Sequence, residues 1–244
     1  MSKKELLEKI SKNKKVLDSK RPLSQGEIKA VRKWFDVSYT YHTNAIEGNT
    51  LTLGETRMIL EDGLTVGGKQ VKEILEVKSH QQALNLLFEI VKNKKDFSEE
   101  VICALHQKLL LGIDDENAGR YRKIQVYITG SEELPPPAKK VPELMREFIK
   151  WSDDYKNKIN NLELAILVHY KFVKIHPFID GNGRIARLLL NLILLKNSYP
   201  PVIIPVIKRQ EYIKSIQKGE EDFMVLMLEI INNNLEDYLR MIEE

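Results

Sequence analysis

Apolar residues recur every three or four positions along most of this 244-residue chain. That spacing puts them on one face of an α-helix and predicts a mainly α-helical bundle. Residues 123–128 alternate instead between polar and apolar, as a half-exposed strand does, and predict one arm of a small β-hairpin. Helices are expected within residues 1–20 and over 24–43, 53–62, 71–91, 98–111, 141–155, 164–175, 185–195, 211–217 and 223–242.

The composition bounds the class of protein. With 43% hydrophobic residues, the chain can bury a full core as one domain with a small helical extension. Its longest apolar runs, such as residues 192–195, are far too short to span a membrane. No charged and then apolar leader opens the chain, and Cys103 is its single cysteine. We therefore expect a cytoplasmic protein with no disulfide and no membrane partner.

Lysines crowd the first twenty residues although the net charge of the whole chain is only +3. A basic run can bind nucleic acid. Here, however, Leu6, Leu7, Ile10 and Leu17 recur at helical spacing between the lysines. This pattern favours an amphipathic helix with a solvated lysine face, so a nucleic-acid partner is not expected.

The loop at residues 176–184 lies between two expected apolar helices and is equipped for phosphate chemistry. Pro177 disfavours helical angles at His176, so the first helix should end there. Gly181 and Gly183 can adopt unusual backbone angles and leave their N–H groups uncovered. These amides would lie at the N-terminus of the second helix, where the helix dipole attracts anions.

The charged side chains of the same segment suit a nucleotide. Asp180 offers the hard carboxylate oxygen that Mg²⁺ accepts while it is bound to phosphates. Arg184 and Arg187 share one helix face and can each make bidentate contacts to phosphate. His176 could accept a proton from an attacking hydroxyl group. Together these residues predict nucleotide-dependent group transfer.

Residues 176–187 read His-x-Phe-x-(Asp/Glu)-Gly-Asn-Gly-Arg-x-x-Arg without a departure. In this the chain resembles the Fic (filamentation induced by cAMP) family, over roughly residues 39–212. The resemblance implies a Fic-type helical bundle with the small β-hairpin as a flap beside the active site. Residues 1–35 would then be an N-terminal helical extension, and residues 36–244 the Fic domain.

The resemblance also implies a protein adenylyltransferase, which moves AMP from ATP to a hydroxyl group of a target protein with Mg²⁺ as cofactor. His176 would be the general base and Asp180 the metal ligand. The related Doc kinases carry lysine at position 183, so the glycine here favours AMP transfer over phosphate transfer. Residues 217–222 depart from the small residues that the family usually carries near the adenine. Nucleotide contacts are expected from Gly181, Asn182, Gly183, Arg184, Arg187 and Tyr212.

A second motif, at residues 43–48, matches the family's inhibitory pattern (Ser/Thr)-x-x-x-Glu-(Gly/Asn). It is expected on an inhibitory helix at about residues 38–48. In the family this glutamate pairs with the second arginine of the signature, which implies a contact between Glu47 and Arg187 here. Glu47, with Thr43 at the start of the motif, is therefore a candidate internal brake on nucleotide binding.

The flap suggests how a target protein could dock. In Fic proteins this hairpin pairs with an extended segment of the target, which implies docking at Val126, Tyr127 and Ile128. The target would present a Ser, Thr or Tyr hydroxyl and could be the chain itself. Relatives often form dimers, and the apolar tail helix at 223–242 is compatible with a homodimer.

Two alternative functions stay open at this point. Glu47 could position a water molecule for the reverse reaction, the removal of AMP from a modified target. The pocket could also sense a nucleotide without turnover, in a binding or regulatory protein. The three hypotheses differ in what loss of Glu47 or His176 should do to AMP transfer.

Overall fold

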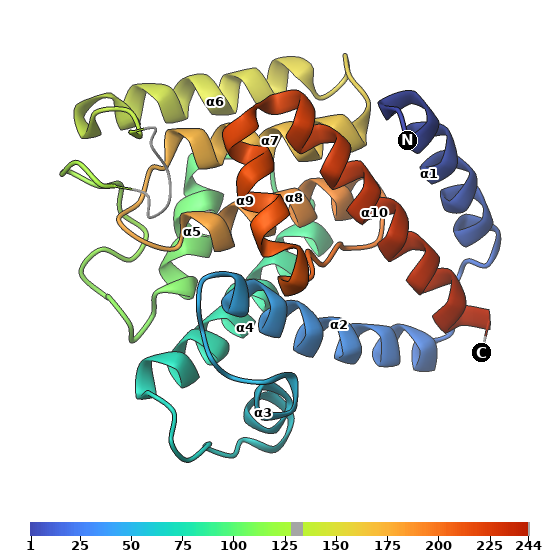
Figure 1. Ribbon diagram of the computed structural model, residues 1–244, viewed down its shortest axis with the longest axis horizontal. Helices are drawn as coiled ribbons and strands as arrows, with labels where there is room; N and C mark the ends of the chain where they lie inside the picture. The colour runs from blue at the N-terminus through green and yellow to red at the C-terminus, as the bar shows by residue number, and fades with distance from the viewer. Residues whose placement is uncertain (128–133, 244) are drawn as a thin grey trace.

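A computed structural model of the chain describes residues 1–127 and 134–243, and these residues form a mainly helical fold, as the sequence predicts (Figure 1). Short helical turns at Met58–Asp62, Ala138–Lys140 and Val206–Lys208 supplement the longer helices. The α-helices within the described residues are α1 (Lys3–Ser19), α2 (Gln25–Ile46), α3 (Leu53–Arg57), α4 (Val71–Lys92), α5 (Glu99–Leu109), α6 (Val141–Tyr155), α7 (Asn161–Ile175), α8 (Asn182–Lys196), α9 (Arg209–Lys218) and α10 (Glu220–Glu243).

Helix α8 forms the centre of the core. Its residues 184–194 are all buried, and it packs against α7, α4, α5 and α2. In Figure 1 it lies in the interior, with α6 on one side and α2 on the other. A helix that is buried all round must be apolar on every face apart from positions with specific partners. The polar side chains of α8 therefore depend on partners from the surrounding helices.

Helix α2 is the element that carries the predicted inhibitory motif. Its N-cap residue is Ser24, whose side chain accepts a hydrogen bond from the backbone N–H of Glu27. The Glu27 carboxylate in turn accepts from the backbone N–H of Ser24. This capping box satisfies two N–H groups that the first turn of a helix leaves without partners. From Gln25, α2 runs 22 residues without a break to Ile46, and Glu47 is its C-cap residue.

Helix α1 packs along α10, and the two lie side by side in Figure 1. Leu6, Ile10 and Leu17 are buried in this contact region, which confirms the amphipathic helix predicted from their spacing. Asn13 Nδ2 also donates to Asn232 Oδ1 over 3.1 Å. The domain division suggested at residues 35 and 36 lies inside α2 and stays a prediction.

The predicted β-hairpin flap is wrong for the residues that the structure describes: residues 123–127 form no strand, and residue 128 lies outside the described part. The returning segment, residues 135–137, consists of prolines, which have no N–H group for a β-ladder. Side chains bridge the two segments instead. Gln125 Nε2 donates to the carbonyl of Pro135 over 3.0 Å, and Arg122 Nη2 donates to the carbonyl of Pro136.

Within the described residues, we find no helix that is both long and apolar enough to cross a membrane.

Replacement of Ile10 by alanine should show that α1 is part of the packed core. The side chain is completely buried, so its truncation leaves a cavity and should lower the free energy of unfolding by about 2–5 kcal/mol. The matched control is Val16→Ala on the same helix, where the side chain is exposed and the change should stay within about 0.5 kcal/mol. Denaturant unfolding of the three proteins measures both; equal stability of Ile10→Ala and wild type would show that α1 does not pack as described.

Candidate active site

The signature loop joins α7 to α8, and its first residue has an unusual backbone conformation. His176 lies in the left-handed region, with φ 52° and ψ 59°, and ends α7 as Pro177 predicts. Few residues other than glycine adopt these angles, which cost of order 1–3 kcal/mol and persist only where the surroundings enforce them. Here Arg122 enforces them, because its Nε donates to the carbonyl of His176 over 2.8 Å and its backbone N–H to the carbonyl of Pro177 over 2.9 Å.

His176 is arranged as a proton acceptor. Its Nδ1 lies 3.3 Å from the carbonyl oxygen of Val173, and because a carbonyl can only accept, Nδ1 must carry the proton. The neutral ring therefore has its lone pair on Nε2. Burial lowers the pKa of His176, the carbonyl of Val173 opposes this shift, and the positive charge of Arg122 adds to it. The neutral form that can accept a proton therefore predominates at neutral pH.

The middle of the loop is closed by Asn182, which is buried. Its Oδ1 accepts from the backbone N–H of Phe178 and its Nδ2 donates to the carbonyl of the same residue, both over 2.9 Å. The side chain of Asn182 thus shapes the loop from inside, and only its backbone remains available for an anion. The first-turn N–H groups of α8, including that of Gly183, have no acceptor within their own helix. A helix N-terminus with such N–H groups can bind an anion, and an anion site here stays a prediction.

Arg184 lies in the first turn of α8 and is only 2% exposed. Its Nη1 is 3.5 Å from both Asn44 Oδ1 and Glu76 Oε1, and its Nη2 is 3.5 Å from Asp180 Oδ2. Among the described residues, the buried Nε of Arg184 has no hydrogen-bond partner. A buried donor without a partner is costly, and an oxygen of a bound phosphate would supply the missing acceptor.

Asp180 fits a Mg²⁺ ion that is shared with a nucleotide. Its side chain is 55% exposed, with Oδ1 accepting from the backbone N–H of Gly181 over 2.6 Å. The described residues contain no group of three or more histidine, cysteine, aspartate or glutamate side chains that could hold a metal by themselves. Magnesium is commonly bound through one or two carboxylates together with substrate phosphates and water. One exposed carboxylate beside the anion site meets that requirement.

Arg187 is completely enclosed and makes the contact expected for the inhibitory motif. Its Nη2 lies 2.6 Å from Glu47 Oε1, while Nε donates to Thr43 Oγ1 over 2.7 Å and Nη2 to the carbonyl of Thr43 over 3.1 Å. Arg187 is 1% exposed, whereas the side chain of Glu47 is 40% exposed. Burial disfavours the charged guanidinium, but the carboxylate of Glu47 and the nearby Tyr212 outweigh it and raise the pKa of Arg187.

Tyr212 joins the site to the core behind it. Its hydroxyl lies 3.4 Å from Arg187 Nη1 and 2.9 Å from His169 Nε2. Burial lowers the pKa of His169 well below its usual value, so its ring is neutral. Tyr212 thus contacts Nη1 of Arg187, whereas Thr43 contacts its Nε and Nη2.

The Fic/DOC sequence profile matches residues 96–194. A solved structure of a segment of Fic-1 from Caenorhabditis elegans is 33% identical, covers 98% of this chain and 71% of its own, and superimposes with a TM-score of 0.84. The chain belongs to the Fic/DOC family. A Fic-domain signaling protein from Bacteroides thetaiotaomicron is 26% identical, covers 96% and 98% of the two chains, and has a TM-score of 0.89.

Among curated proteins, the protein adenylyltransferase fic-1 of Caenorhabditis elegans is 43% identical to this Fic/DOC chain over 181 residues. The match includes 73% of this chain and 35% of that relative. This chain therefore spans about a third of the length of the curated relative that it matches.

Several residues of this Fic/DOC site are absent from the sequence prediction. Glu76 on α4 pairs with Arg184, and its other carboxylate oxygen accepts from Asn49 Nδ2 over 2.9 Å. His106 on α5 bonds to the loop itself, and burial lowers its pKa to about 4. Arg209 Nε donates to the carbonyl of Ile46 over 2.6 Å and so holds the end of α2. For His106 the available signal was a polar residue among the apolar residues of α5.

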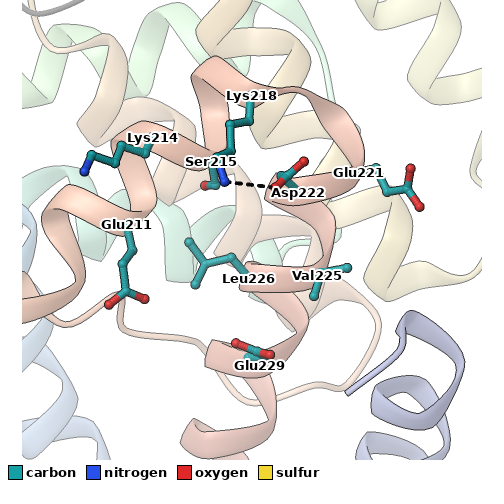
Figure 2. Close-up of a pocket in the computed structure, with 9 residues that line it drawn as sticks. All are labelled: Glu211, Lys214, Ser215, Lys218, Glu221, Asp222, Val225, Leu226 and Glu229. Carbon is teal, nitrogen blue, oxygen red and sulfur yellow. Dashed lines mark ion pairs between the residues drawn. The ribbon is translucent and has the colours of Figure 1, made fainter.

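The predicted flap residues are not joined to this cluster. Tyr127 is 78% exposed, neither Val126 nor Tyr127 forms a hydrogen bond or ion pair with the described residues of the signature loop, and Ile128 lies outside the described residues. A separate surface groove runs between α9 and α10, and Figure 2 shows its charged rim with Lys218 paired to Asp222. None of the predicted site residues lines this groove.

Glu47 and Gly183 approach so closely that they should be energetically coupled. A methyl group added at Gly183 would lie 2.4 Å from Glu47 Oε1, so alanine must displace the carboxylate and should destabilise the protein. With Glu47 replaced by alanine, Gly183→Ala should destabilise the protein much less, because the new methyl group then lies 3.2 Å from Arg187 Nη1, which a small shift relieves. The better helix propensity of alanine should offset this cost by up to about 1 kcal/mol. Unfolding of the two single variants and the double variant measures the coupling; additive effects would contradict this geometry.

Proposed function

We propose that this chain transfers AMP from ATP to a Ser, Thr or Tyr hydroxyl group of a target protein. The observation that carries the proposal is the cluster of residues where α8 begins: a proton-accepting histidine, the N-terminal amides of the helix and two buried arginines, one of them paired with Glu47. Its relatives named protein adenylyltransferase support the same reaction, although the chain spans only 35% of the first of them.

The triphosphate of ATP would bind along the start of α8. Backbone N–H groups of Asn182 and Gly183 would contact the α- and β-phosphates, since they lie at the positive end of the helix dipole. The N–H group of Gly181 would join them by exchanging its hydrogen bond to Asp180 Oδ1 for one to a phosphate oxygen. Arg184 would contact the β-phosphate with its Nε, the donor that is left without a partner within the described residues. Arg187 would contact the γ-phosphate. A Mg²⁺ ion held by Asp180 and the phosphates would neutralise negative charge on the leaving group.

The transfer itself is a substitution at the α-phosphorus. His176 Nε2 would accept the proton of the target hydroxyl while that oxygen forms a bond to phosphorus. The bond between the α-phosphorus and the bridging oxygen breaks, and pyrophosphate leaves with the electron pair. The N–H groups of α8 would stabilise the charge that develops on the non-bridging oxygens.

Glu47 would act as a brake because it occupies a guanidinium edge that the γ-phosphate needs. Its Oε1 is 2.6 Å from Arg187 Nη2 and also stands over Gly183, where a phosphate would approach. A coupling of about 1–3 kcal/mol between such sites changes affinity or rate about 5–150-fold. Any signal that moves the end of α2 would then release the site.

The target would dock at the segment beside the loop. Val126, Tyr127 and Ile128 are the proposed docking residues, and the high exposure of Tyr127 supports this role. An extended target segment could pair with main-chain groups there, which gives affinity with little dependence on target sequence. The described part of the segment is irregular, so strand pairing would have to form with the target.

A second candidate is the removal of AMP from a modified target. The observation that favours it is the position of Glu47, whose carboxylate is 40% exposed within the site and could orient a water molecule. Loss of Glu47 would then abolish the activity, the opposite of what the brake hypothesis predicts.

Labelling with ATP that carries the isotope on the α-phosphate tests the proposal. We expect Glu47→Gly to increase labelling of proteins in a cell extract about 5–150-fold over wild type, because Arg187 is released. Addition of His176→Ala should return labelling to background. Glu116→Gly, an exposed loop glutamate, is the matched control and should behave as wild type.

Three outcomes of this assay are decisive. Label from α-labelled but not from γ-labelled ATP identifies AMP transfer. No labelling by any variant that still binds ATP would reject it and favour a nucleotide sensor. Labelling that disappears from a premodified target only while Glu47 is present would favour the reverse reaction.

The pH dependence of transfer should reflect the lowered pKa of His176. Because burial lowers this pKa below the usual value of about 6.5, the base stays unprotonated at lower pH than an exposed histidine would. We expect the acid limb of kcat/KM for Glu47→Gly to lie below pH 6.5. A limb at or above pH 6.5 that requires His176 would contradict the assignment.

A further inference from the structure

His106 lies beneath the signature loop, on a helix that the sequence motifs do not include. It is completely buried on α5 and bonds to two separate stretches of backbone. Its Nε2 is 3.0 Å from the carbonyl oxygen of Asp180, and the backbone N–H of Gly119 donates to its Nδ1 over 2.9 Å. Its ring also stacks on Phe178 with centroids 3.6 Å apart and planes at 4°.

The two partners allow only one form of the ring. A backbone N–H can only donate, so Nδ1 of His106 must be the unprotonated acceptor. A carbonyl can only accept, so Nε2 must carry the proton and donate to Asp180. The ring of His106 therefore joins two loops: its Nε2 donates to Asp180 and its Nδ1 accepts from Gly119.

The contact to Asp180 bears on the proposed metal ligand itself. The accepting carbonyl and the carboxylate belong to the same residue, so fixing the carbonyl restricts where the carboxylate can point. The next residue is constrained as well, because a Cβ at Gly181 would lie 3.4 Å from His106 Nε2 and 3.1 Å from Leu109 Cδ2. The loop thus contacts α5 at Asp180 and Gly181, and the side chain of Asp180 faces solvent.

Other loop carbonyls are held in a comparable way by residues outside the signature. Arg122 holds those of His176 and Pro177, as His106 holds that of Asp180. These three carbonyls are thus turned into the protein, whereas the Asp180 side chain stays 55% exposed. A ligand site needs such support to hold its geometry within a fraction of an ångström.

We propose that His106 is a positioning residue, which sets the direction of the Asp180 carboxylate for a divalent cation bound with the nucleotide. It touches neither the substrate nor the reacting atoms. The inference rests on the proposed function for its biological meaning, but the cation affinity that it predicts can be measured without any transfer reaction.

Two substitutions separate the two hydrogen bonds of the ring. In His106→Gln the side-chain amide can replace Nε2 and donate to Asp180, whereas in His106→Asn it can replace only Nδ1 and accept from Gly119. Both are made with Glu47→Gly, so that the nucleotide can bind. Mn²⁺ binding to each protein with a non-hydrolysable ATP analogue is followed by electron paramagnetic resonance, and nucleotide binding is measured separately without metal.

We expect His106→Asn to weaken Mn²⁺ binding about tenfold and His106→Gln to change it less than threefold, with nucleotide binding without metal the same in both. Such a loss is typical when a residue that orients a metal ligand is removed. The control Leu105→Ala removes a buried neighbour on α5 that should lower stability without moving Asp180.

The proposal is overturned if both His106 variants retain Mn²⁺ affinity, if they lose it equally, or if Leu105→Ala loses as much as His106→Asn. The first result would show that Asp180 needs no such support. The others would show general loosening of α5. Absence of AMP transfer in all variants would count against the proposed function, while the Mn²⁺ measurements would still decide the role of His106.

Discussion

The burial of two arginines on the central helix is the constraint on which the rest of this structure depends. Arg184 and Arg187 are 2% and 1% exposed, and an ion taken out of water costs several kcal/mol unless its partners compensate. Those partners come from other helices: Thr43 and Glu47 from the end of α2, and Glu76 from α4. The same contacts that pack α2 and α4 onto α8 therefore set carboxylates beside both cations at the place where phosphates would bind.

The contacts of Arg187 differ in how easily a ligand could replace them. Thr43 is buried and holds the guanidinium through both its hydroxyl and its carbonyl, so these bonds belong to the scaffold. Glu47 is the partially exposed partner and approaches from the side of Gly183. A phosphate that displaced it would exchange one anion for another, with Arg187 already in place. The same arginine could thus hold Glu47 in an inhibited state and be already in position for a phosphate once Glu47 leaves.

The signature loop depends on residues that lie far from it in the sequence. Arg122 holds its start, His106 its middle, and Asn182 closes it from within. These residues fix carbonyl oxygens, which would repel phosphates, while the Asp180 side chain stays 55% exposed. The left-handed conformation of His176 is one consequence, since two hydrogen bonds from Arg122 enforce angles that the residue alone would avoid.

The sequence by itself determined the helical character of the chain and the chemistry of the loop, because helical periodicity and contiguous motifs depend on neighbours within a few residues. Pro177 predicted the end of α7 at His176. The contact between Glu47 and Arg187 was predicted only from the resemblance to a family. It failed at residues 123–127, where alternation suggested a strand but the opposing prolines lack N–H groups. Only the tertiary structure decided the contacts of Glu76 and His106, since a polar residue on a helix reveals its partner only after distant helices pack together.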